Sequence, residues 1–334
     1  MNKINHRSRN QQGFMGVAEA IIILIVLGVM GFGAWKVYSS RSDKSSSQTT
    51  TTTVSAPSQN SKTWQVGGVA VAGNWADADV VSLGGGRYRM YYSVEPEVSG
   101  NKLEMYSATS EDGIKWTQEA GTRKTFATFP SVLKLPDGKW RLYFQNAGVI
   151  KSALSSDGLS WQDEAGTRLD AANSLGLNFE NVAAPSVERL DDGTYLMVYR
   201  GTVNQAYNDQ APNKNTQLFL WATSKDGLSW EKQGLAIDSR NSTLQGLADG
   251  PEFVPKWDDG SVKLFFWGYA GVYESTYANN QFSQPKLVYS GQSSSSQNKF
   301  PQNPPGDPTL LKVGDTWYMY YGQHTKGIYY ATLK

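Results

Sequence analysis

Cysteine is absent from the 334-residue chain, and neither sign of charge is in excess. Without a thiol, the chain cannot form a disulfide, a cysteine-ligated zinc or iron–sulfur site, or a thiol nucleophile. The 31 Lys and Arg residues nearly balance the 30 Asp and Glu residues. Because no overall basic field would hold nucleic acid, we expect no nucleic-acid partner.

Glycine and aromatic residues are abundant instead. The chain has 33 Gly, 11 Trp, 18 Tyr and 12 Phe. Glycine permits tight turns and aromatic side chains suit strands, so this composition predicts packed β-sheet. It also suits a protein that handles sugars, because aromatic rings stack against the apolar face of a sugar ring, although a β core alone would explain it.

The N-terminal residues 1–38 are typical of an export or membrane signal. An apolar run of 16 residues, Ala20 to Trp35, is extended by apolar flanks toward the roughly 20 residues that span a bilayer. The segment Gly13 to Glu19 resembles a type IV prepilin signal, with Gly before the cleavage point, Phe after it and Glu inside the helix. Glu19 would be the sixth mature residue, whereas the family has Glu at the fifth. A plain signal anchor is an equal alternative.

Residues 39–62 are rich in Ser and Thr, including five consecutive threonines from Thr49 to Thr53. Such a segment buries too little apolar surface to fold, so we expect a disordered linker. We therefore predict a single-pass cell-membrane protein whose remaining part, 63–334, lies outside the cell. The prepilin-like start adds pilus-like machinery as a candidate partner, beside the membrane itself.

The segment 63–334 contains five copies of one unit, in which an apolar strand, a tight glycine turn and an alternating strand follow one another. The copies start at Ala78, Pro130, Pro185, Pro251 and Pro308, at spacings of 52, 55, 66 and 57 residues. Each spacing accommodates one four-stranded sheet, which predicts an all-β, five-bladed β-propeller. In blade 1 we expect strands over about 78–83, 87–93, 102–109 and 115–119.

A second motif follows the first three hairpins, at Ser110–Trp116, Ser156–Trp161 and Ser224–Trp230. We expect its Asp to bind backbone amides, its Gly to adopt positive φ and its Trp to pack between neighbouring sheets. The motif is similar to the Asp-box of sialidase-type propellers. We interpret it as structural.

The last unit supplies only three strands, ending with Ile328 to Leu333. The segment 64–72 precedes blade 1 and has no other partner, so we predict that it becomes the fourth strand of blade 5 and closes the ring. The alternative is an open ring with a bare edge.

In a propeller the innermost strands line a central channel, and their first residues converge on one mouth. Five carboxylates stand at these positions, and neighbouring carboxylates push their pKa values apart, as acid and base catalysis requires. These are Asp77, Asp79, Asp249, Glu252 and Asp307. Other candidates for substrate binding, most of them at second-strand ends, are Trp75, Asn146, Arg200, Trp267, Tyr269 and His324.

Five repeats, Asp-Pro at a strand start and Asp-box-like turns together resemble the five-bladed β-propeller glycosidases, which include glycoside hydrolase family 43 and the invertase-like enzymes. Family 43 implies an Asp base on blade 1, a pKa-tuning Asp on blade 2 and a Glu acid on blade 3. Asp77 matches the base, but Phe129 and Ala184 stand at the other two positions. We therefore predict Asp77 as base, with Glu252 ahead of Glu180 as acid and Asp249 as a further candidate.

The resemblance also implies that His324 could lie near an ion, so a structural Ca²⁺ in the channel is conceivable, while we identify no other cofactor and no metal ligands. Three functions remain open. The first is a membrane-anchored extracellular glycoside hydrolase that cleaves a poly- or oligosaccharide. The second is a non-catalytic carbohydrate-binding propeller, and the third is a pilus-associated adhesive protein.

Overall fold

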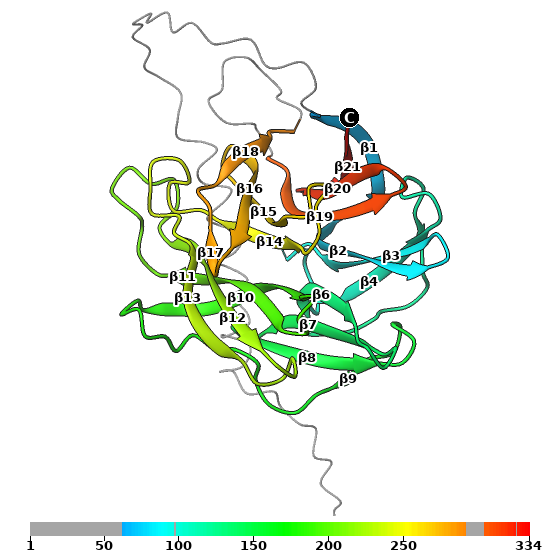
Figure 1. The fold of residues 1–334 in the computed structure, drawn as a ribbon, viewed down its shortest axis with the longest axis horizontal. Helices are drawn as coiled ribbons and strands as arrows, with labels where there is room; N and C mark the ends of the chain where they lie inside the picture. Colours follow the sequence, from blue (N-terminus) through cyan, green and yellow to red (C-terminus); the bar gives the residue numbers. More distant parts are fainter. Residues whose placement is uncertain (1–61, 97, 292–303, 325) are drawn as a thin grey trace, which may run out of the picture.

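The computed structural model describes residues 62–96, 98–291, 304–324 and 326–334. Five antiparallel sheets surround a common axis, which confirms the five-bladed β-propeller (Figure 1). Within these ranges no helix is long and apolar enough to cross a membrane. The predicted anchor and nearly all of the predicted linker lie outside the described residues, so both stay predictions.

Blades 1 to 3 each run outward from the axis in chain order. Blade 1 consists of β2 (Trp75–Gly84), β3 (Arg87–Val94), β4 (Met105–Ser110) and β5 (Thr117–Gln118). Blade 2 consists of β6 (Thr128–Lys134), β7 (Trp140–Asn146), β8 (Val149–Ser155) and β9 (Gln162–Asp163). Blade 3 consists of β10 (Phe179–Arg189), β11 (Tyr195–Val203), β12 (Thr216–Ser224) and β13 (Glu231–Ile237). The third strand of blade 1 begins later than predicted, because Leu103 adopts a left-handed φ of 54°.

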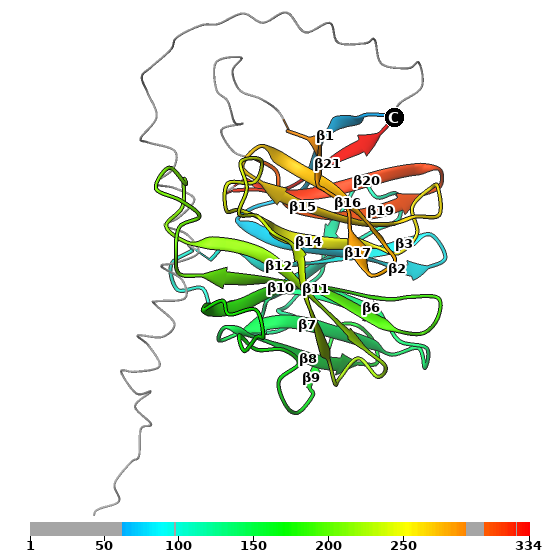
Figure 2. The same cartoon turned by 60° about the vertical axis from the view of Figure 1, so that its left-hand side comes forward.

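Blade 4 has a divided outer edge, and blade 5 is completed from the other end of the described chain. Blade 4 consists of β14 (Asp249–Val254), β15 (Val262–Gly268), β16 (Gly271–Ala278), β17 (Gln281–Phe282) and β18 (Lys286–Tyr289). Blade 5 consists of β19 (Gly306–Val313), β20 (Thr316–Gln323), β21 (Gly327–Leu333) and β1 (Trp64–Ala72). β1 pairs antiparallel with β21, so the predicted ring closure is confirmed and the open ring is excluded (Figure 2).

Each innermost strand has a β-bulge at one equivalent residue, which we call its mouth position. The mouth positions are Asp77, Phe129, Ala184, Gly250 and Asp307, with φ of 52°, 51°, 46°, 56° and 45°. The pairing register shifts at this point in all five blades. Left-handed backbone is unfavourable for residues with a Cβ, and its fivefold repetition marks these residues as a candidate functional ring.

Two residues after each mouth position, a side chain accepts a hydrogen bond from a main-chain N–H of the next innermost strand. The N···O distances are 2.9 Å for Val132 to Asp79, 3.0 Å for Val187 to Ser131, 2.8 Å for Phe253 to Ser186, 3.2 Å for Leu310 to Glu252 and 3.1 Å for Val80 to Thr309. The five bonds form a closed ring, which we call the belt. The belt joins every blade to its neighbours around the axis.

The Asp-box-like turns join the outer parts of neighbouring blades, as predicted. In the first turn, Asp112 Oδ1 accepts hydrogen bonds from the amides of Ile114 and Lys115. A tyrosine of the preceding blade donates to the glycine carbonyl of each turn, at 2.7 Å for Tyr320 to Gly113, 2.7 Å for Tyr91 to Gly158 and 2.8 Å for Tyr143 to Gly227. The motif tryptophans pack edge-to-face on the same tyrosines.

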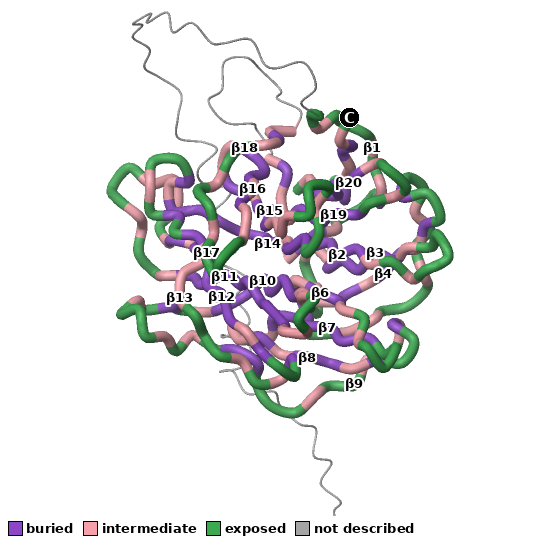
Figure 3. The backbone as a smooth tube through the Cα atoms, in the orientation of Figure 1, coloured by how far each residue is buried: buried purple, intermediate pink, exposed green. Residues whose placement is uncertain are grey.

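Aromatic side chains contribute to both interfaces of blade 4 instead. Phe219 of blade 3 packs edge-to-face on Phe266 of blade 4, with 5.2 Å between ring centroids. Trp257 of blade 4 stacks on Trp317 of blade 5, with 4.3 Å between centroids. Figure 3 shows the resulting burial, with the strands near the axis buried and many peripheral turns exposed.

Candidate functional site

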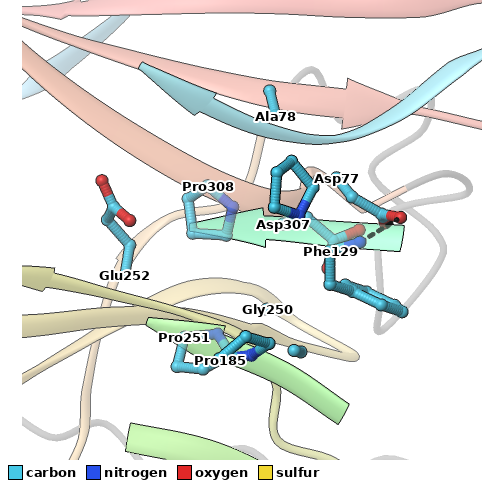
Figure 4. Close-up of a pocket in the computed structure, with 11 residues that line it drawn as sticks. Asp77, Ala78, Phe129, Pro185, Gly250, Pro251, Glu252, Asp307 and Pro308 are labelled. Carbon is cyan, nitrogen blue, oxygen red and sulfur yellow. Dashed lines mark hydrogen bonds between the residues drawn. The ribbon is translucent and has the colours of Figure 1, made fainter. Parts of the chain in front are cut away.

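The mouth positions and the residues that follow them surround a small cavity, of about 20 Å³, at the entrance of the channel (Figure 4). The left-handed backbone places the side chains of Asp77, Phe129 and Asp307 around this space. Pro130, Pro185, Pro251 and Pro308 line it next, so its wall is rigid. The site is therefore built from one backbone conformation that is repeated around the axis with different side chains.

Asp77 is the buried carboxyl that the blade 1 position supplies. Its Oδ2 accepts a hydrogen bond of 3.4 Å from the amide of Phe129. Burial first, then the charges of Glu95 and Asp249, raise the pKa of Asp77 to about 7. A carboxyl with this pKa can take up or release a proton near neutral pH.

Asp307 is the second mouth carboxyl. Its Oδ1 accepts a hydrogen bond of 3.1 Å from Trp267 Nε1. Burial and then the charges of Asp77 and Asp249 raise the pKa of Asp307 well above its usual range. Gly250 lies directly against this carboxylate, and a Cβ on Gly250 would collide with Asp307 Oδ1.

Asp249 adds a third carboxylate, whose charge is balanced by Arg200. Arg200 Nη1 donates to Asp249 Oδ2 at 2.5 Å, and the amide of Gly250 donates to Asp249 Oδ1 at 2.8 Å. The Arg200 guanidinium is only 2% exposed and lies 5.0 Å from the centroid of the Phe129 ring. Arg200 therefore partners Asp249, since a buried carboxylate needs a partner, and its predicted contact with substrate stays a prediction.

The five predicted mouth carboxylates are divided between two layers. Asp79 and Glu252 belong to the belt, and Glu252 Oε1 also accepts a hydrogen bond of 2.9 Å from Thr309 Oγ1. Burial raises the pKa of Asp79 to about 7, and burial followed by the charge of Asp79 raises that of Glu252 well above its usual range. In Figure 4, Pro308 lies between Glu252 and the mouth carboxyl Asp77.

A sixth acid in this region, Glu188, escaped the sequence interpretation. It lies two residues after Ser186 on β10, and therefore on the same face of that strand. Burial and the charge of Asp79 raise the pKa of Glu188 to about 8. The period-2 alternation along β10 was the signal that could have identified it, because Ser186 already occupies the belt position.

The belt acids do not fit the Ca²⁺ that we considered for the channel. Asp79 and Glu252 already accept main-chain hydrogen bonds. The part of the chain that the structure describes holds no group of three or more Asp, Glu or His side chains arranged to bind a metal ion. We therefore assign no metal-dependent step.

His324 lies at the rim and contacts Glu95, which ends the second strand of blade 1. Glu95 is only 5% exposed, whereas the His324 side chain is 55% exposed, and 3.4 Å separates His324 Nδ1 from Glu95 Oε2. The electrostatic effect of Glu95 on Asp77 makes it part of the site. Glu95 directly follows β3, the strand that pairs with β2, which carries Asp77.

Trp267 and Tyr269 flank the second-strand end of blade 4. Trp267 binds Asp307, as described above, and so belongs to the mouth. Tyr269 lies in the turn between β15 and β16, where burial raises its pKa. Their proposed contacts with substrate stay predictions.

Of the predicted residues, Asp77, Glu252 and Asp307 line the cavity, and Trp75, Asn146 and Glu180 are among those that do not. Trp75 Nε1 donates to the carbonyl of Ala72 at 2.8 Å, and its ring packs on Tyr92. Asn146 Nδ2 donates to the carbonyl of Phe126 at 2.7 Å. Glu180 is exposed at the start of β10. These positions do not test whether the three side chains contact a long substrate, so their predicted roles also stay predictions.

No family model and no curated protein matches the chain. Among solved structures, it is similar to a member of the GH130 family of mannoside phosphorylases, which contains glycoside hydrolases that target β-1,2 mannosidic linkages in Candida mannan. The identity is 14%, the TM-score is 0.58, and the match covers 83% of this chain and 95% of that one.

Two family 43 structures are similar to the same extent. A thermostable family 43 glycoside hydrolase matches with 15% identity and a TM-score of 0.55, over 80% of this chain and 91% of that one. A family 43 β-xylosidase/α-arabinofuranosidase from a compost microbial metagenome matches with 15% identity and a TM-score of 0.57, over 81% and 94%. The chain therefore has the fold of the five-bladed β-propeller glycoside hydrolases.

Proposed function

We propose that the protein is a glycoside hydrolase that cleaves glycosidic bonds of a poly- or oligosaccharide at the propeller mouth. The observation that carries the proposal is the pair of carboxyls, Asp77 and Asp307, that line one open cavity, with the buried Asp249 next to the lining residue Gly250. Glycoside hydrolysis needs one carboxyl that gives a proton and another that receives one. The glycoside hydrolases with the same fold support the proposal.

The two titratable mouth carboxyls suit the two roles. Asp77, with a pKa of about 7, is the base that takes a proton from water as the water oxygen attacks the anomeric carbon. Asp307, whose raised pKa favours its protonated form, gives its proton to the glycosidic oxygen as the carbon–oxygen bond breaks. We place the acid at Asp307 ahead of Glu252, which also lines the cavity but is held by two belt hydrogen bonds, and ahead of Glu180, which does not line the cavity.

Sugar recognition at this mouth would combine rings with carboxylates. Trp267 and Phe129 supply apolar faces, and the aspartates accept hydrogen bonds from hydroxyl groups. This set of groups favours a neutral, hydroxyl-rich ligand over an anionic one.

A non-catalytic carbohydrate-binding propeller is the second candidate. Phe129 and Ala184 at two mouth positions favour it, because they stand where the family 43 pattern has its other two acids. The mouth would then bind a sugar without cleaving it.

We also propose that residues 1–38 anchor the protein in the cell membrane, with 39–62 as the linker and the propeller outside the cell. Protease treatment of intact cells should then release a fragment of the propeller. N-terminal sequencing after coexpression with a prepilin peptidase distinguishes a new terminus at Phe14, which would support pilus-like machinery, from the uncleaved anchor.

A glycan screen of the full chain tests the function. Aryl-glycosides and plant or bacterial polysaccharides are offered to the wild type, Asp77→Asn, and Asp137→Asn, a change in an exposed turn between β6 and β7. Turnover that is lost only in Asp77→Asn supports the proposal. Turnover that survives in Asp77→Asn rejects Asp77 as the base, and binding without turnover by the wild type favours the second candidate.

A further inference from the structure

A short chain of polar groups leads from Asp77 to the rim of the propeller. Ser93 lies opposite Ala76 in the β2–β3 pairing, so the end of β3 runs beside the mouth residue Asp77. Glu95 follows two residues later, where its amide donates to the carbonyl of Asn74 at 3.0 Å. These backbone contacts place Glu95 on the strand end next to β2, which carries Asp77.

His324 connects this chain of groups to solvent. It belongs to the turn between β20 and β21 of blade 5, yet its Nδ1 lies 3.4 Å from Glu95 Oε2 of blade 1. A largely exposed imidazole is thus placed on a buried carboxylate. Imidazole is the side chain whose charge ordinarily changes between about pH 5 and 8, the range in which a neutral-pH catalyst must exchange protons.

We propose that His324 and Glu95 form a positioning pair that controls how readily Asp77 gives up its proton. When His324 is protonated, its charge offsets that of Glu95, and Asp77 ionises more easily. When His324 is neutral, the full negative charge of Glu95 acts on Asp77, which then keeps its proton to a higher pH. The importance of the pair for catalysis rests on the proposed function, but the coupling itself does not.

Other charged groups also act on Asp77, from different strands. Asp249 on β14 raises its pKa, although the charge of Asp249 is offset by Arg200 on β11. Asp307 on β19 interacts with Asp77 as well. Glu95 differs from these neighbours in its partner. That partner, His324, can itself gain or lose a proton near neutral pH and is in contact with solvent.

NMR titration of the full chain tests the pair without any substrate. Aspartate carboxyl carbons and histidine rings are ¹³C-labelled; the chain has only two histidines, and Asp77→Asn and His324→Gln identify the two signals that matter. We expect His324→Gln to raise the Asp77 midpoint by about 0.5 to 1 pH unit, and Glu95→Gln to lower it by a similar amount. The double variant should behave like Glu95→Gln alone.

Two further variants separate the pair from a general change in charge. Lys326→Gln removes an exposed positive charge from the same turn and should leave the Asp77 midpoint unchanged. His324→Lys keeps a positive charge at all relevant pH values and should hold the midpoint low. Equal shifts in His324→Gln and Lys326→Gln, or no shift in His324→Gln, overturn the proposal. A shift in a protein that cleaves no glycoside supports the pair and counts against the hydrolase instead.

Discussion

The mouth and the belt use the same kind of residue for different purposes. Asp77 and Asp79 are two residues apart on β2, both are buried, and burial is the main reason that the pKa of each is about 7. Asp79 accepts a hydrogen bond from the amide of Val132, and Ser131 and Ser186 accept the equivalent hydrogen bonds in the next two blades. Asp77 instead faces other carboxylates across a cavity.

This difference shows how repetition separates structure from function. At the belt position, Ser, Thr, Asp and Glu all make the same interblade hydrogen bond, so the carboxylates there do a job that a hydroxyl can do. At the mouth position, the backbone is repeated but the side chains differ completely. Residues that vary on a repeated, strained backbone are therefore the better candidates for chemistry.

Asp77→Asn should have the largest effect in the comparison, on turnover alone. If Asp77 is the base, turnover falls by about 10²- to 10⁴-fold. The temperature of unfolding at pH 8 should stay the same or rise, because a buried charge has been removed. Steady-state kinetics and thermal melts of one preparation measure the turnover and the unfolding temperature. A variant that retains turnover but unfolds at a lower temperature would reverse the assignments of mouth and belt.

Asp79→Ala should show the opposite pattern, with stability lost and turnover largely kept. The amide of Val132 loses its acceptor, which costs about 1–3 kcal/mol of unfolding free energy. Asp79→Ser, the residue of blades 2 and 3, should recover most of that loss. Urea titrations of the two variants measure the difference. Equal stability of Asp79→Ala and Asp79→Ser would mean that the belt hydrogen bond does not stabilise the fold.

Gly250→Ala tests the mouth through its backbone. The left-handed φ of 56° costs an alanine roughly 1–2 kcal/mol, and its Cβ would also displace Asp307. Gly138→Ala is the matched control, since its φ of 86° is also positive but its Cβ would meet open space. Both variants should lose stability, whereas only Gly250→Ala should lose turnover; equal turnover in the two would exclude Asp307 as the acid.

The smallest expected effect is a slope of stability with pH. Asp77 and Asp79, with pKa values of about 7, and Glu188, with about 8, hold protons in the folded protein that the unfolded chain releases near pH 4. The stability that these protons contribute is complete below about pH 4 and is lost as pH rises toward 7 to 8, by up to about 1.4 kcal/mol per pH unit for each group.

Glu188→Gln isolates one such group. The slope of unfolding free energy between pH 5 and 8 should become shallower, while turnover is unchanged. Denaturant titrations at several pH values give the slope, and an unaltered slope would mean that Glu188 is ionised in the folded protein.

Much of the fold was predictable because its signals are local and repeated. The Asp-Gly turns mark the hairpins, as Asp137, Asp192 and Asp259 do by accepting amides two residues ahead. The three-stranded last unit required a partner, and 64–72 was the remaining segment. The predicted start of β4 was too early, because alternation along the sequence does not reveal the left-handed Leu103.

The candidate site was predictable only in outline. Equivalent positions in the repeats identified Asp77 and Asp307, but they could not show that Arg200 would be covered by Phe129 and paired with Asp249. Neither could they show that Asp79 and Glu252 would carry belt hydrogen bonds, since a bulge changes which way each residue of the strand faces.

The sequence by itself determined the number of blades, their turns and the strand that closes them, because hydrogen-bonded turns and alternating strands are encoded within about 15 neighbouring residues. Only the tertiary structure decided which carboxylates meet. The charges that act on Asp77 come from Glu95 on its own blade, Asp249 on blade 4 and Asp307 on blade 5, and their burial depends on closing the ring. Electrostatic coupling falls with distance in space, and the ring alone brings these distant segments of the chain together.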